Sequence, residues 1–83
     1  MNLDDLRDKI FDLAQDHNEN IQLAEDFVNE KNNTLIKQSK KVIMGLEKKI
    51  DKIFAKIPDR YPYKNDLGIM INGLKTNSSN LFK

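Results

Sequence analysis

The chain has 83 residues, a formal net charge of +1 at pH 7, no cysteine and a single histidine, His17. This length allows one domain with a small core, and the composition excludes a disulfide, a thiolate metal site and a metal site with several histidines. The apolar runs are too short to cross a bilayer and the acidic start of the chain does not resemble a secretory signal, so we expect a cytoplasmic protein.

Charge is divided unevenly along the chain. Residues 1–30 hold nine acidic and two basic residues, whereas residues 31–57 hold eight lysines and two acidic residues. The acidic and basic segments can neutralise each other side by side, or each can attract a partner of opposite charge.

Residues 3–30 are predicted to form the first helix, because apolar residues recur there at steps of three and four. His17 lies on the same stripe and is expected to be a partly buried, hydrogen-bonded helix residue, with a pH-sensitive contact as the alternative. Asn2 is expected to cap the helix. The polar run 16–20 could break it near Asn18, but we favour one continuous helix because the apolar phase is preserved across that run.

The second helix is predicted over residues 34–57, after an Asn-rich turn and with Thr34 as its cap. Isoleucine recurs every seven residues in this segment, at Ile36, Ile43, Ile50 and Ile57. The repeat indicates either a coiled-coil seam for a partner or the core of an antiparallel hairpin. The hairpin core is favoured because the repeat is short and the stripe is wide. Gly45 has no side chain and could allow another helix to pack close to this one.

A third, short helix is predicted over residues 66–75, capped by Asn65 or Asp66, after a loop that begins at Pro58. Residues 76–83 are expected to form a mobile tail. The chain is therefore predicted to be all-α, with a single domain over residues 1–75 that consists of an antiparallel helical hairpin and the short third helix. Two helices and a short third cannot cover both apolar stripes, so a homodimer that forms a helical bundle is expected.

No catalytic, metal or nucleotide motif is present, so we expect neither an enzyme nor a cofactor. The function predicted is protein binding through a helical surface, as in a small adaptor, regulator or inhibitor. Its size and form are analogous to immunity-type and phage-encoded inhibitors. Tyr and Arg are enriched in binding hot spots and acidic clusters attract basic partners. The predicted partner-binding residues are Arg60, Tyr61 and Tyr63 in the loop and Asp8, Asp12 and Asp16 on the first helix.

The alternative prediction is a nucleic-acid-associated regulator that uses the lysine face of the second helix. Clustered lysines neutralise phosphate. Against it stand the scarcity of Arg for reading bases and of aromatic residues for stacking on single strands. The lysine face consists of Lys37, Lys41, Lys48, Lys52 and Lys56.

Overall fold

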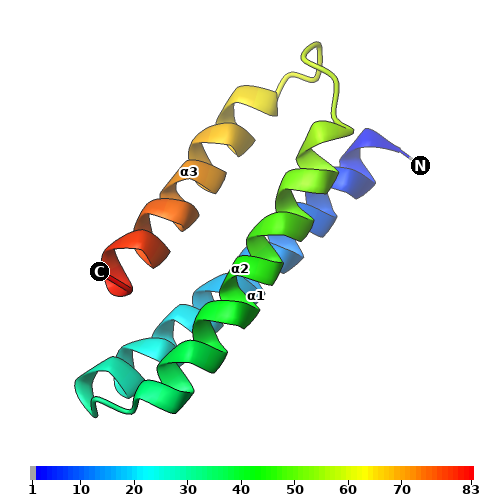
Figure 1. Cartoon of the computed structure of the whole chain (residues 1–83). Helices are drawn as coiled ribbons and strands as arrows, with labels where there is room; N and C mark the ends of the chain where they lie inside the picture. Colours follow the sequence, from blue (N-terminus) through cyan, green and yellow to red (C-terminus); the bar gives the residue numbers. More distant parts are fainter. Residues whose placement is uncertain (1) are drawn as a thin grey trace.

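The computed structural model describes residues 2–83 and shows three helices: α1 (Leu3–Asn29), α2 (Asn33–Ala55) and α3 (Lys64–Leu81). Helices α1 and α2 form a long antiparallel hairpin, and α3 returns along it from the loop at the far end (Figure 1). The molecule is elongated, with extents of 44 × 20 × 15 Å. The prediction of an all-α hairpin with a third helix is confirmed.

Helix α1 is continuous across the polar run 16–20, as predicted. The Asn2 side chain caps its start by accepting a hydrogen bond of 2.8 Å from the Asp4 backbone N–H. Within the run, the Asn20 side chain donates to the Asp16 carbonyl at 2.8 Å. Within this polar run, His17 occupies the position that faces the core. It is fully buried, and its Nε2 is hydrogen-bonded to Glu47.

The turn between α1 and α2 has the left-handed residue and the paired hydrogen bonds of a Schellman motif. Lys31 has a φ of 57°. Its N–H donates to the Val28 carbonyl at 3.1 Å, and the Asn32 N–H donates to the Phe27 carbonyl at 3.0 Å. The Asn32 side chain then caps α2 by accepting from the Leu35 N–H. The prediction of Thr34 as the cap is wrong, because Asn32 holds that place and Thr34 lies inside the first turn.

Helix α2 ends before Pro58, and the side chain of Lys64 caps that end. Lys64 Nζ donates to the carbonyls of Phe54, at 3.3 Å, and Ile57. The same ammonium lies 4.3 Å from the centroid of the Phe54 ring, within the range of a cation–π contact. Because Lys64 is also the first residue of α3, this contact ties the start of α3 to the end of α2.

Helix α3 is longer than the sequence predicted, at both ends. It begins at Lys64 with Tyr63 in the cap position and no side-chain cap, so the prediction of Asn65 or Asp66 as the cap is wrong. It continues to Leu81, so the predicted tail over residues 76–83 is helical for most of its length. The physical reason is tertiary contact: Ser78 is buried, and Leu81 and Phe82 pack against the buried apolar residues Ile21, Ala24 and Ile43.

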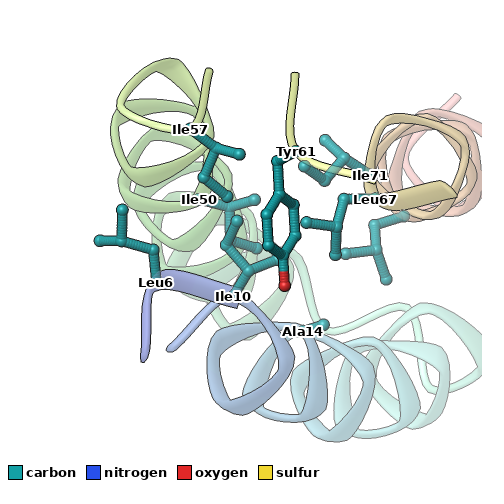
Figure 2. Close-up of a cluster of buried hydrophobic side chains, with 9 residues drawn as sticks. Leu6, Ile10, Ala14, Ile50, Ile57, Tyr61, Leu67 and Ile71 are labelled. Atoms are coloured by element: carbon teal, nitrogen blue, oxygen red, sulfur yellow. The ribbon is translucent and has the colours of Figure 1, made fainter. Parts of the chain in front are cut away.

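The apolar core is divided into two clusters along the hairpin. The larger lies towards the loop and takes side chains from all three helices (Figure 2). The smaller lies towards the α1–α2 turn and consists of Ile21, Ala24 and Ile43. Ile43, Ile50 and Ile57 are almost fully buried, which confirms the hairpin core for three of the four repeat positions, whereas Ile36 is partly buried and lies in neither cluster. The larger cluster consists of Leu6, Ile10, Ala14, Ile50, Ile57, Tyr61, Leu67, Ile71 and Leu74.

A polar network joins the three helices between these clusters. His17 of α1 is fully buried, and its Nε2 lies 2.8 Å from Glu47 Oε2 of α2. The Ser78 hydroxyl of α3 donates to the same carboxylate oxygen at 2.7 Å. One carboxylate therefore bonds a buried group from each of its two neighbouring helices. His17 is a hydrogen-bonded helix residue, as predicted, but it is fully rather than partly buried, and its Nδ1 has no hydrogen-bond partner among residues 2–83.

Removing Glu47 should destabilise the fold, because its loss leaves the His17 ring buried without a partner. Glu47→Ala should lower the free energy of unfolding by about 1–3 kcal/mol. Replacing the three residues together, as His17→Leu, Glu47→Leu and Ser78→Ala, should recover most of that loss, since no buried polar group is then left unpaired. Urea denaturation followed by circular dichroism measures both. Glu25→Ala, at an exposed site on α1, is the control, and equal losses in the single and triple variants would contradict the argument.

Two glycine exchanges should stabilise the chain for opposite reasons. Gly45 lies inside α2 and an added Cβ would meet no atom within 4 Å, so no helix of this chain approaches it closely and the expectation of such an approach is not met. Gly45→Ala should raise the free energy of unfolding by about 1 kcal/mol through helix propensity.

Lys31→Gly should raise the free energy of unfolding by about 1 kcal/mol, because glycine adopts the left-handed conformation of this position without strain. Chemical denaturation measures both, and Lys31→Ala, which keeps the Cβ, should show no gain.

Candidate functional site

A groove of about 290 Å³ lies between α1 and α3 at the loop end of the bundle. We call it the α1/α3 groove. It exposes two aromatic side chains, Phe11 at 46% and Tyr63 at 52% of their full surface. Its lining residues are Arg7, Phe11, Tyr63, Asp66, Leu67 and Met70. A groove with two large exposed aromatic rings is the most distinctive surface feature on this side of the molecule.

Helical geometry produces the groove. On α1, Ile10 points into the core and Phe11, the next residue, is turned by about 100° towards the edge of α3. On α3, Leu67 is buried and Met70 is half-buried one turn later. Leu67 thus contributes to both the core and the groove, and the aromatic ring of Phe11 stands on the opposite side of the groove from α3.

The loop that supplies Tyr63 is fixed by Tyr61. Tyr61 is only 7% exposed, and its ring lies between the α2 isoleucines and the α3 residues Leu67 and Ile71 (Figure 2). Its hydroxyl donates to Asp4 Oδ1 of α1 at 2.7 Å. The rings of Tyr61 and Tyr63 meet edge to face, with centroids 5.7 Å apart and an angle of 69°. Tyr61 therefore holds Tyr63 in position at the groove.

The rim of the groove is acidic. Arg7 lines it, but its guanidinium is shared by Asp8, at 3.1 Å, and Asp4, at 3.5 Å. The pKa of Arg7 is raised, chiefly by its hydrogen bond to Asp8. Asp66 adds a third carboxylate from α3. The charged lining residues are therefore Arg7 and Asp66; together with Asp4 and Asp8, which pair with Arg7 from outside the lining, this group of side chains carries a net negative charge.

The structure separates the six partner-binding residues that the sequence indicated. Tyr63 lines the groove and Asp8 reaches its rim through Arg7. Tyr61 is a core side chain, so only Tyr63 of the pair presents its ring to solvent. Arg60 is exposed in the loop, and Asp16 is exposed on α1. Asp12 lines a different groove, between α1 and α2.

Five groove residues were not among the predicted site residues: Arg7, Phe11, Asp66, Leu67 and Met70. Phe11 carried a usable signal. It directly follows a stripe residue, so the periodicity of α1 places a large aromatic ring outside the apolar stripe. Such a ring is either a surface anchor or a contact of a further element. Arg7 and Met70 carried no comparable signal, since each fits an ordinary helix edge.

The lysine face of the alternative prediction is exposed throughout. None of its five lysines forms an ion pair with a residue in the described range 2–83. Lys52 and Lys56 also line the groove between α1 and α2, with Asp12 and Leu13 opposite them. The face is therefore available to an anion, but its two C-terminal lysines border an apolar groove.

Over residues 2–83, no three or more His, Asp or Glu side chains converge as metal ligands would. No helix within that range combines the length with the apolarity that crossing a membrane requires. Comparison of the chain with protein-family models, curated proteins and solved structures gave no match.

Tyr61 should make stability depend on pH in the alkaline range. Its pKa is raised above the usual 10.0, first by burial and then by the hydrogen bond to Asp4. Above pH 10 the folded chain keeps a proton that the unfolded chain loses, so the free energy of unfolding falls as pH rises towards the raised value. The free energy of unfolding of Tyr61→Phe should fall less steeply in this pH range, and at pH 7 the variant should be modestly less stable than the wild type. Urea titrations from pH 7 to 11 measure this. Equal slopes in the wild type and in Tyr61→Phe would contradict it.

Proposed function

We propose that this protein is a non-catalytic interaction module, a small cytoplasmic adaptor, regulator or inhibitor, that binds a segment of another protein in the α1/α3 groove. The observation that carries the proposal is the pair of half-exposed aromatic rings, Phe11 and Tyr63, that line one groove. Aromatic residues held by a rigid support are the usual anchors of protein interfaces. Tyr61 provides that support for Tyr63 through their edge-to-face contact.

The chemistry of the groove favours a basic partner segment with apolar anchor side chains. The floor is supplied by Leu67 and Met70, which suits an aliphatic or aromatic anchor. The surrounding carboxylates of Asp4, Asp8 and Asp66 favour Lys or Arg in the partner. The volume of about 290 Å³ lies at the lower limit of small-molecule pockets, so side chains of a peptide fit it better than a large metabolite.

The nucleic-acid alternative has weaker support. Its lysines are exposed and free of ion pairs within residues 2–83, which is compatible with phosphate binding. However, the aromatic rings that could stack on bases lie on α1 and in the loop, on the acidic α1/α3 groove rather than on the lysine face. Phosphate would be repelled where stacking is available, so we favour the protein partner.

We also propose that the module acts as a homodimer, as the width of its apolar stripes indicates. The α1/α3 groove supplies a site for a different protein, so self-association requires another face. The two contacts are separable by mutation because they use different residues.

A peptide selection tests the groove. Peptides of about 20 residues, helical in part, are displayed on phage and selected on the immobilised protein at physiological salt. We expect enrichment of sequences that join Lys or Arg to a large apolar anchor. Fluorescence anisotropy should then show at least a tenfold loss of affinity, about 1.4 kcal/mol, in Phe11→Ala and in Tyr63→Ala.

The control is Ile69→Ala, which removes a 63% exposed side chain of α3 that does not line the groove. Arg60→Ala measures whether the exposed loop arginine adds to the contact. Selected peptides that bind equally well to Phe11→Ala and Tyr63→Ala would refute the groove. Labelled DNA and RNA are titrated in parallel: binding that falls steeply with salt and is lost in Lys41→Glu/Lys48→Glu would support the alternative instead.

A further inference from the structure

The hairpin has a second groove on the side that α3 leaves open. It lies between α1 and α2, with a volume of about 520 Å³, and we call it the α1/α2 face. Its floor contains Leu13 and Ile53. Its lining residues are Lys9, Asp12, Leu13, Lys49, Lys52, Ile53 and Lys56.

The contacts of α3 show that this face is turned away from it. Helix α3 meets α2 through Ser78–Glu47, Lys75–Asp51 and Lys64–Phe54. The positions 47, 51 and 54 form one edge of α2. The positions 42, 46, 49, 53 and 56 form the other edge, and they recur at steps of three and four. The polar contacts of α3 thus lie on the first edge, and the lining of the α1/α2 face includes no residue of α3.

The α1/α2 face continues towards the α1–α2 turn as a partly apolar stripe. On α1 the same helical steps lead from Leu13 to Leu23, which is 55% exposed. On α2 they lead from Ile53 through Leu46 to Val42, which is 49% exposed. Large apolar side chains exposed in line along two neighbouring helices are typical of a covered surface.

The two edges of the face carry opposite charge at matching levels. Asp12 and Asp16 lie on the α1 side, and Lys49, Lys52 and Lys56 lie on the α2 side. The register is fixed by the His17–Glu47 hydrogen bond, so Asp16 is level with Lys49 and Leu23 is level with Val42. Lys9 is the exception on the α1 side: in the same register it is level with Lys56, so like charges meet at this level, with Asp5 and Asp12 one turn away on either side.

We propose that a second copy of this chain covers the α1/α2 face, with the two-fold axis parallel to the helices, so that α1 of each copy lies beside α2 of the other. This inference specifies the face and symmetry of the homodimer proposed above and rests on that homodimer. Rotation about an axis parallel to the helices does not shift any residue along the helix direction. Residues that are level within one hairpin are therefore also level between the two copies. The acidic edge then meets the basic edge, and Leu23 meets Val42.

The other face-to-face arrangement has its axis across the helices. It would place α1 against α1 and α2 against α2, and so acidic edge against acidic edge and lysine against lysine. Charge therefore selects the parallel axis. In that dimer every neighbouring pair of helices is antiparallel, as in an up-down four-helix bundle, and both α1/α3 grooves remain open at the same end.

Light scattering coupled to gel filtration tests the face. The wild-type chain should elute at twice the chain mass at micromolar concentration. Leu23→Asp and Val42→Asp should each weaken the dimer at least tenfold and keep wild-type helicity, because both side chains are about half exposed. Ile69→Asp, which places the same charge on the outer side of α3, should remain dimeric.

Crosslinking tests the symmetry, and the absence of native cysteine makes it direct. Single-cysteine chains Asp16→Cys and Lys49→Cys are treated with a short bis-maleimide, separately and mixed. We expect a crosslinked product from the mixture and little from either chain alone, since equivalent α1 positions are diagonal in the bundle.

The outcomes separate the homodimer from its face. A monomeric wild type at all concentrations would overturn both. A dimer that survives Leu23→Asp and Val42→Asp would overturn the face but leave the homodimer standing. Efficient self-crosslinking of Asp16→Cys would overturn the parallel axis alone. Peptide binding at Phe11 is independent of all three results.

Discussion

The arrangement of this small protein depends on one carboxylate. Glu47 accepts hydrogen bonds from His17 and Ser78, and so fixes the register of α1 and α3 against α2 at a single point. A purely apolar seam would tolerate a shift by two turns, because isoleucine recurs every seven residues along α2. Such a shift would take Glu47 away from the fully buried His17 ring, whose Nε2 would then lack a partner, which is costly in a low-dielectric interior. The polar network thus supplies specificity that two small apolar clusters on either side do not supply.

The same carboxylate explains where reasoning from the sequence succeeded and where it failed. The stripes of α1 and α2 were readable because apolar periodicity is a local property, and the helices begin and end within two residues of the predicted limits. The extension of α3 was not readable. Residues 76–80 have the composition of a solvated tail, and they are helical because the Ser78 hydroxyl bonds to Glu47, a residue 31 positions earlier in the chain. No residue near Ser78 in the sequence indicates that it bonds to Glu47. Glu47 itself looks like an ordinary acidic residue in a lysine-rich segment.

The candidate site shows the same division between local and distant information. The loop with Tyr61 and Tyr63 stood out by composition, but only the fold assigns the two rings different roles, with Tyr61 buried against Asp4 and Tyr63 exposed beside Phe11. The acidic residues of α1 looked like one patch because they share a helix. In three dimensions Asp8 pairs with Arg7 of the α1/α3 groove, whereas Asp12 lines the α1/α2 face. A helix has two edges, and a sequence pattern does not say which neighbour lies at each.

Where α3 docks therefore decides what each charge is available to do. By packing on the Glu47 edge of α2, α3 brings Lys75 to Asp51 and leaves Lys49, Lys52 and Lys56 on the opposite edge. The acidic residues of α1 and the lysines of α2 therefore do not neutralise each other across the α1/α2 face. Although the two helices are adjacent, their charged edges lie on either side of a groove and form no ion pairs across it within residues 2–83. The near-zero net charge and the strong local charges are compatible if the acidic edge of one molecule is neutralised by the basic edge of another. In that arrangement α3 has two effects: it completes the core of its own chain, and it leaves exposed the one hairpin face whose charges suit a second copy.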